Sequence, residues 1–267
     1  MPQSWRRVVF IRWKPSASHA EVARAMNLHR GLVRAVPVVL SINEGFTFTS
    51  ICDGAGAYPG VADGRQNKIP RPGGSSDNTD AHGGAEDGFD SCIEIILSCA
   101  TSDDVLRSYF QHPAHVAVAS AVDPLILESW AMDWTEDRDA LRVPAGSLSV
   151  MKHVCFFKWH PGTTAKQQVA LFNAWKSLTE SMTHCVSVSC GEAIRWSNGE
   201  KRGYHAGLVV DLALVSGDGV DEIQRYAFSK EYQSINDKFL APIRKDYAVM
   251  DYAVHGHAMG TGTTSKM

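Results

Sequence analysis

An internal repeat dominates this sequence of 267 residues. Residues 7–15 read Arg-Val-Val-Phe-Ile-Arg-Trp-Lys-Pro, and the pattern returns 146 positions later, at 153–161, as His-Val-Cys-Phe-Phe-Lys-Trp-His-Pro. The same spacing relates Asn43-Glu-Gly45 to Ser189-Cys-Gly191. Because both longer segments are apolar, strand-like runs that end at a proline, the pattern predicts a duplicated structural unit.

Further along the chain the spacing of the repeat shortens to 117 or 118 residues. It then pairs Tyr109 with Tyr226, Pro124 with Pro242, and Asp133-Trp134 with Asp251-Tyr252. The first copy therefore holds 29 additional residues before its third strand. They fall in residues 53–88, which are rich in Gly, Pro, Asp and Ser and show no periodicity, so we predict a long surface loop there.

Each copy shows the same order of elements: strand, helix, strand, strand, helix, strand. Ser18 and Glu21 have the spacing of a capping box, which predicts the start of the first helix. We assign the apolar faces of the first helix in each copy to Val22, Ala25, Met26, Leu28 and Leu32, and to Val169, Leu171, Phe172, Trp175 and Leu178. The alternating strand that follows is expected to bury Val38, Leu40 and Ile42 in the first copy, and Val186 and Val188 in the second.

This order predicts the fold class α+β, with two tandem ferredoxin-like βαββαβ units. Helices cover only one face of each sheet, so we expect the two open faces to pack together as a fused, pseudo-twofold dimeric α/β barrel. The predicted domains are residues 1–134, with the insertion at 53–88, and residues 147–258. A polar linker at 135–146 joins them, and residues 259–267 form a flexible tail.

Composition excludes several function classes. Lys and Arg number 26 against 29 Asp and Glu, which argues against an electrostatic nucleic-acid partner. No apolar run is long enough to predict a membrane span. The six cysteines form no Cys-x-x-Cys pair and the first residues lack a signal-like apolar run, so a reducing cytoplasmic compartment is expected. The ending Ser265-Lys266-Met267 is close to a peroxisomal address, which leaves that compartment as the alternative.

One segment carries a family resemblance. Tyr109-Phe-Gln-His112-Pro-Ala-His115-Val resembles the Tyr-x-x-His-Pro-Ala-His segment of the stress-responsive dimeric α/β-barrel (Dabb) family. The first strands that end in basic-x-x-Pro and the last strands that close on Asp-Trp or Asp-Tyr fit the same family. The resemblance covers nearly the whole chain except residues 53–88 and the two ends. Members normally homodimerise as single domains, so this chain resembles a tandem version.

The resemblance also implies site residues. The family includes polyketide cyclases of the olivetolic acid cyclase type, in which a Tyr and a His of this segment form the catalytic pair; they match Tyr109 and His115. The first-strand His of that enzyme falls at Arg7 and at His153, and its third-strand His has no counterpart. The second copy keeps Tyr226 but has Ser229 and Tyr232 at the His positions. We therefore predict one acid–base site, in the first copy, and take as candidate substrate-binding residues Arg7, His112, His153, Tyr226 and Tyr232.

The residue types suit chemistry on a carbonyl group. Pro113 lacks an N–H and disfavours helix at the residue before it, so His112 is expected at a cap and His115 one turn later, pointing inward. A neutral imidazole can take a C–H or O–H proton, and a Tyr hydroxyl can hold a carbonyl oxygen as it becomes an enolate. The competing interpretation makes this segment a structural helix corner, His153 a core histidine and Arg7 a solvated or paired cation.

These observations favour a cofactor-independent cyclase or lyase that acts on a small, apolar, polyketide-like carbonyl compound held in the barrel interior. The alternatives are a non-catalytic stress-responsive or ligand-binding barrel and a cofactor-free monooxygenase. No metal is expected, because the His-x-x-His at 112 and 115 has no third ligand spaced nearby. The pairing of the two copies makes the partner of each unit intramolecular, and further homodimerisation is left open.

Overall fold

The computed structural model describes residues 3–51, 89–99, 101–137, 149–194, 202–214 and 219–254. The predicted insertion at 53–88 lies outside these residues, as do residues 138–146 of the predicted linker and the tail at 259–267. None of the described helices combines the length and the hydropathy that a membrane crossing requires.

In the described residues, the first half contains four strands and a set of short and long helices. Its elements are β1 (Gln3–Trp13), α1 (His19–Ala35), β2 (Val39–Ile51), β3 (Ser91–Leu97), α2 (Ser102–Val105), the π-helical turn η1 (Leu106–Phe110), α3 (Pro113–Val122), the 3₁₀ turn η2 (Asp123–Leu125) and β4 (Ile126–Asp137). β4 thus continues past Trp134, where the sequence predicted the strand to end.

The second half repeats this order. Its elements are β5 (Val150–Trp159), α4 (Ala165–Lys176), α5 (Leu178–Ser181), β6 (Cys185–Glu192), β7 (Ala206–Ala213), α7 (Val220–Ala227), α8 (Lys230–Ile235), the π-helical turn η4 (Asn236–Leu240) and β8 (Arg244–Val254).

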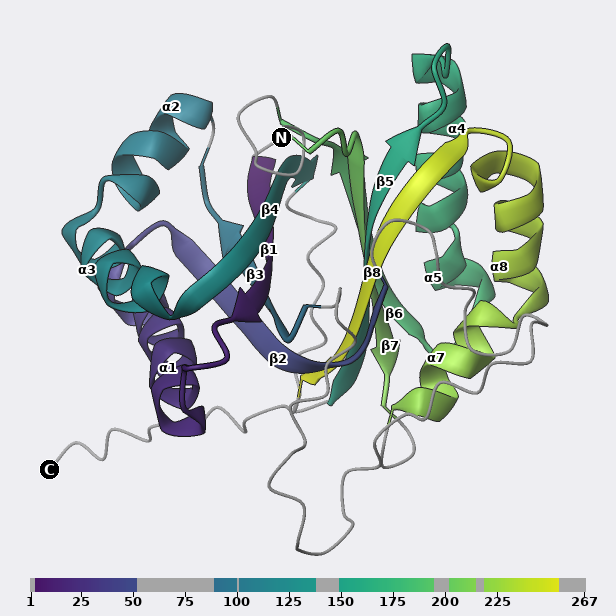
Figure 1. Ribbon diagram of the computed structural model, residues 1–267. Helices are drawn as coiled ribbons and strands as arrows, with labels where there is room; N and C mark the ends of the chain where they lie inside the picture. Colours follow the sequence, from purple (N-terminus) through teal and green to yellow (C-terminus); the bar gives the residue numbers. More distant parts are fainter. Residues whose placement is uncertain are drawn as a thin grey trace, which may run out of the picture.

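The strands form one antiparallel arrangement in the order β4-β1-β3-β2-β8-β5-β7-β6. Each half has the strand order of a ferredoxin-like unit, and β2 pairs with β8 across the halves. On the opposite side β4 lies beside β6, where the amide of Ile194 donates to the carbonyl of Asp133 at 2.9 Å. Figure 1 shows α1–α3 on one flank and α4–α8 on the other, with the strands between them. The predicted tandem α+β fold is confirmed.

Three apolar positions were assigned wrongly from the sequence. The predicted capping box of Ser18 and Glu21 does start α1, but Leu28 is exposed because it lies off the stripe formed by the buried residues of that helix. Val169 of α4 is exposed because the buried face follows Leu171 and Trp175, one turn apart. In β2 an irregular register after Val39 turns Leu40 outward and Val39 inward.

The described residues form three apolar cores. Two lie between a sheet and its own helices, one in each half. The third fills the space between the two sheets with side chains from both halves. At its centre Phe10 stacks on its repeat equivalent Phe156, with ring centroids 4.3 Å apart and planes 6° apart. The expectation that the barrel interior holds a substrate is therefore wrong, because aromatic and aliphatic side chains occupy that space.

Glycines mark the two joints between the halves. Trp134 packs so closely on the second half that a Cβ at Gly207 would lie 2.5 Å from its Cζ3 atom, and a Cβ at Gly191 would lie 2.8 Å from its Cδ1 atom. At the other joint a Cβ at Gly45 would lie 2.5 Å from Tyr252 Cδ2. The repeated Gly and Trp/Tyr positions of the sequence are therefore the contact points of the pseudo-twofold fold.

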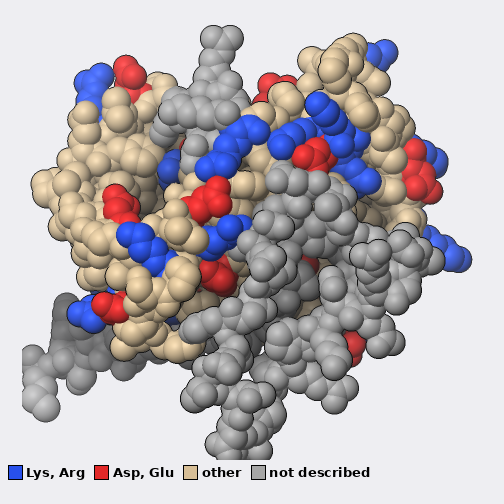
Figure 2. Space-filling model, in the orientation of Figure 1, with Lys and Arg blue, Asp and Glu red and all other residues tan. Residues whose placement is uncertain are grey.

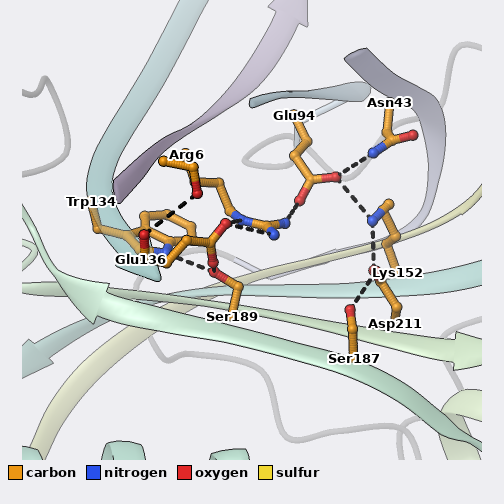
Figure 3. A network of polar contacts seen from close by, with 10 residues as sticks. Arg6, Asn43, Glu94, Trp134, Glu136, Lys152, Ser187, Ser189 and Asp211 are labelled. Atoms are coloured by element: carbon orange, nitrogen blue, oxygen red, sulfur yellow. Dashed lines mark hydrogen bonds and ion pairs between the residues drawn. The ribbon is translucent and has the colours of Figure 1, made fainter. Parts of the chain in front are cut away.

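A buried polar network also joins the halves (Figure 3). Arg6 forms ion pairs with Glu94 and with Glu136, whose Oε1 lies 3.0 Å from Arg6 Nε. Lys152 of the second half lies 2.9 Å from Oε2 of Glu94 and 2.5 Å from Oδ1 of Asp211. Two cations thus face three carboxyl groups, and the Lys152–Glu94 pair links β5 to β3.

Neutral donors complete the network. The side-chain amide of Asn43 donates to Glu94 at 2.7 Å, and the hydroxyl of Ser187 donates to Asp211 at 2.7 Å. Ser189 donates to Glu136 and accepts from the indole N–H of Trp134 at 2.9 Å. Because buried charge is costly unless it is paired and hydrogen-bonded, these contacts make the network tolerable in the interior.

Replacing Gly207 with Ala is expected to lower the free energy of unfolding by roughly 1–3 kcal/mol, because the new methyl group overpacks against Trp134. The measurement is urea denaturation followed by circular dichroism. Gly31→Ala is the matched control: it lies in α1 with nothing within 4 Å of the added carbon, and should raise stability by about 0.5–1 kcal/mol. Equal effects of the two changes would contradict the described joint.

Replacing Lys152 with Met should cost about 3–5 kcal/mol of unfolding free energy, because Glu94 and Asp211 lose their shared cation in the interior. The control is Lys158→Met on the same strand. Lys158 pairs with Asp246 at 3.1 Å, but its side chain is 23% exposed, and such pairs contribute at most about 1 kcal/mol. A small loss for Lys152→Met in urea denaturation would show that the network does not hold the halves together.

Candidate active site

A break in the second helical region brings Tyr109 and His115 together. In η1 the amide of Gln111 donates to the carbonyl of Leu106 at 2.9 Å, a π-type bond that widens the turn. Pro113 then occupies the first turn of α3, and His112 is its N-cap, with Nδ1 accepting from the amide of Ala114 at 3.2 Å. The cap position expected for His112 is confirmed. The ring centroids of Tyr109 and His115 lie 4.3 Å apart.

Tyr109 is the buried member of the pair, with 1% of its surface exposed. Burial raises the pKa of its hydroxyl to about 12; the charge of Arg7 opposes this shift and that of Asp133 adds to it. The phenol is therefore protonated at neutral pH, which makes it a hydrogen-bond donor.

His115 is half-buried and has a defined tautomer. Its Nδ1 lies 3.3 Å from the carbonyl oxygen of Phe110. A carbonyl only accepts, so Nδ1 carries the hydrogen and Nε2 of the neutral ring keeps its lone pair. Burial lowers the pKa of His115; Arg7 and His29 act in the same direction, against the Phe110 carbonyl and Asp123. A neutral imidazole with an available Nε2 is the form that accepts a proton.

Arg7 lies at the same site. Its Nη1 donates to both carboxylate oxygens of Asp133, at 2.8 and 3.0 Å, and its guanidinium lies 4.8 Å from the ring centroid of Phe110. The indole N–H of Trp5 also donates to Asp133, at 3.3 Å. Arg7 is therefore a paired cation, one face of which covers an aromatic ring beside Tyr109 and His115.

The sequence did not identify Asp133 and Phe110 as site residues. Asp133 was visible as a repeated Asp on the last strand, and the β1–β4 register sets it directly opposite Arg7. In the second half Asp251 lies opposite His153 in the same way. A basic residue on the first strand therefore pairs with an acidic residue on the last strand in both halves. The predicted pairing of the first and last strands could have identified these acids from the sequence.

The remaining predicted residues form a separate cluster in the second half. Nδ1 of His153 lies 2.7 Å from Oδ1 of Asp251, and the ring of Tyr226 lies 5.2 Å from His153 and 4.8 Å from Tyr232. The predicted set is therefore split between the two helix–sheet cores, with the packed barrel interior between them.

The second cluster includes a residue that the sequence did not indicate. Sγ of Cys155 lies 3.0 Å from Nε2 of His153. Burial lowers the pKa of His153, but Cys155 and Asp251 outweigh burial and raise it to about 10. The described residues contain no group of three or more His, Cys, Asp or Glu side chains placed to hold a metal ion.

A hollow of about 520 Å³ lies apart from both clusters. It is bounded by the turn after β5 and the segment before β7, and its lining includes Lys158, Arg202, Lys245, His160 and His205. Figure 2 shows Lys and Arg side chains gathered around the end of β5 and the start of β8 on this face. None of the predicted site residues lines this hollow.

The match to a known protein family covers the second copy of the repeat. Residues 151–254, which run from the second residue of β5 to the end of β8, match the family described as Stress responsive A/B Barrel Domain, or Dabb. The second half of this chain is a Dabb domain. The comparison with curated proteins gives no match.

Solved structures show how widely the fold extends along the chain. A candidate monooxygenase from Lactobacillus acidophilus NCFM is 12% identical, with 95% of this chain and 96% of that chain covered and a TM-score of 0.51. An anthrone oxidase-like protein is 10% identical, with 100% and 98% covered and a TM-score of 0.51. Hydroxynitrile lyase from Passiflora edulis is 17% identical, with 52% and 97% covered and a TM-score of 0.35. At these identities the first two show that the Dabb domain and the first half together share the fold of other whole chains.

The pKa of His115 provides a test of the site. Nuclear magnetic resonance titration should place it below 6.5, and Arg7→Gln should move it upward, because one of the charges that lower it is removed. Arg12→Gln, on the other face of β1, should leave it unchanged. In the unfolded chain His115 binds its proton near the ordinary pKa, which is above its pKa in the native protein. The contribution of His115 therefore lowers the free energy of unfolding as the pH falls through the range between these two pKa values. A pKa above 6.5 in the native protein would contradict the described burial.

Proposed function

We propose that the first half is a cofactor-independent acid–base site for a small, apolar, polyketide-like carbonyl compound, of the cyclase or lyase type. The observation that carries the proposal is the contact between a protonated Tyr109 and a neutral His115, with ring centroids 4.3 Å apart. Arg7 supports it because its positive charge, placed over the Phe110 ring, acts on both Tyr109 and His115.

The residues divide the work as follows. Nε2 of His115 takes a proton from the carbon next to the carbonyl group. Tyr109 donates a hydrogen bond to the carbonyl oxygen as it becomes an enolate, and Arg7 offsets part of the negative charge. The enolate carbon then attacks a second carbonyl carbon of the same molecule, and the proton on His115 passes to the new alkoxide. The reverse sequence breaks the same bond, which is the lyase direction.

The surroundings of the pair favour an apolar substrate. Tyr109 belongs to the helix–sheet core of the first half, and Phe110 and Ala114 pack against that core. His115 is the half-buried member of the pair and lies toward the surface. His112 uses Nδ1 for the cap of α3, so its contribution to substrate binding would come from Nε2.

Proton exchange tests the proposal without knowledge of the natural substrate. The full chain should accelerate exchange of the methyl protons of small apolar ketones, such as acetophenone, with deuterium oxide, measured by nuclear magnetic resonance. His115→Gln should reduce this acceleration by roughly 10²–10⁴-fold, and Tyr109→Phe should also reduce it. His160→Gln, an exposed histidine of the second half, is the control and should keep the full rate.

Other outcomes separate the alternatives. Exchange that is unchanged in His115→Gln, with the fold intact by circular dichroism, would overturn the proposal. Saturable binding of ketones with no exchange would favour a ligand-binding barrel. Oxygen uptake with a quinol substrate would favour the cofactor-free monooxygenase; of the similar structures, one is named a monooxygenase and one anthrone oxidase-like.

A further inference from the structure

The second cluster contains the three side chains of a nucleophilic thiol site. His153 and Cys155 are two residues apart on β5, so both point toward the helices of the second half. Asp251 lies directly opposite His153 on β8. The imidazole therefore bridges the two other groups, with Nδ1 2.7 Å from the Asp251 carboxylate and Nε2 3.0 Å from the Cys155 sulfur.

The hydrogen bonds fix where the proton lies. A carboxylate only accepts, so Nδ1 of His153 carries a hydrogen, and Nε2 faces the sulfur. The Cys155 proton either stays on the sulfur and points at Nε2 or moves to Nε2 and leaves a thiolate paired with an imidazolium. Both arrangements provide the activated thiol on which nucleophilic cysteine chemistry depends.

The other buried cysteines lack this arrangement. Burial raises the pKa of Cys92 and of Cys190 to about 12, and the Cys190 thiol lies 3.7 Å from the carbonyl of Phe172. Cys155 is buried to a similar degree, with 3% exposed against 0% for Cys92 and 5% for Cys190, but it has an imidazole beside it. The repeat equivalent of Cys155 in the first half is Val9, so the first half has no corresponding thiol.

Tyr226 adds a hydroxyl donor that has no hydrogen-bond partner among the described residues. Its hydroxyl is buried and makes no hydrogen bond with the described residues, although an unsatisfied buried hydroxyl is destabilising. Its ring lies 5.2 Å from that of His153. A carbonyl oxygen of a bound molecule would supply the missing acceptor. The other titratable groups near the site are Tyr232 of α8, Cys185 of β6, and Arg244 and Tyr247 of β8.

We propose that Cys155 is a nucleophile that forms covalent adducts with small α,β-unsaturated carbonyl compounds, with His153 as its proton partner, Asp251 as the residue that orients His153, and Tyr226 as the donor to the carbonyl oxygen. The sulfur forms a bond to the β-carbon, and the electron pair of the carbon–carbon double bond moves to give an enolate. Tyr226 hydrogen-bonds the enolate oxygen, and His153 returns its proton to the α-carbon. The product is a thioether, so no oxidant, reductant or leaving group is needed.

The test uses the full chain with Cys52, which lies outside the described residues, replaced by Ser. The native protein is treated with methyl vinyl ketone, and adducts are located by peptide mass spectrometry. We expect one adduct, on Cys155, with Cys92 and Cys190 unmodified as internal controls. His153→Gln should slow its formation by roughly 10²-fold, Asp251→Asn and Tyr226→Phe should slow it less, and the ultraviolet absorbance of a thiolate should be lower in Cys155→Ser.

Two results would overturn the proposal: modification of Cys155 no faster than that of Cys190, or wild-type rates in a folded His153→Gln variant. If that variant does not fold, the test is the pH dependence of the rate of adduct formation in the chain that retains His153 and Cys155. A rate of adduct formation that follows a single free thiol near its ordinary pKa would exclude the imidazole from the step, whereas a rate already maximal well below that pH supports it. The first-half variant His115→Gln should not change the rate, which separates this proposal from the proposed function.

Discussion

The Lys152–Glu94 ion pair is the interaction on which the joined architecture depends. It crosses from β5 to β3 in the interior, and both groups are fully enclosed. Such a pair adds little net stability compared with well-packed apolar groups, but removing one partner leaves a charge that cannot reach water. A slipped or rotated arrangement of the two sheets would separate Lys152 from Glu94 and Ser189 from Glu136. The network therefore favours one relative placement of the halves over others that would bury similar apolar area.

That single placement supports two different clusters at equivalent positions. In the first half the first strand carries Arg7 opposite Asp133, with Tyr109 and His115 above. In the second half it carries His153 opposite Asp251, with Tyr226 and Tyr232 above. The basic–acidic pair between the first and last strands is retained in both halves, whereas the residues around it differ. The fold thus fixes where polar groups meet, and the individual side chains determine which chemistry is available.

Much of the fold was accessible from the sequence because repeated residues are in repeated environments. Gly45 and Gly191 recur because each faces the large ring of the other half, and Pro113 indicated the helix break and the cap at His112. Contacts between elements were less accessible. Nothing local indicates that Arg6 and Lys152 turn inward, since alternating strands often begin with a charged residue. The register change after Val39, the packing of the barrel interior and the approach of Cys155 to His153 all depend on the three-dimensional pairing of strands.

The stack of Phe10 on Phe156 lies where an axis of symmetry would pass in a dimer of identical subunits. In such a dimer any substitution at that position is made twice, and a residue cannot adapt to a partner different from itself. Here the two rings are separate positions of one polypeptide, and the halves meet at a high effective concentration set by the chain that connects them. Each half can therefore be substituted independently at this position. An unequal pair such as Lys152 with Glu94 can form at one place without a symmetry-related copy of the same pair.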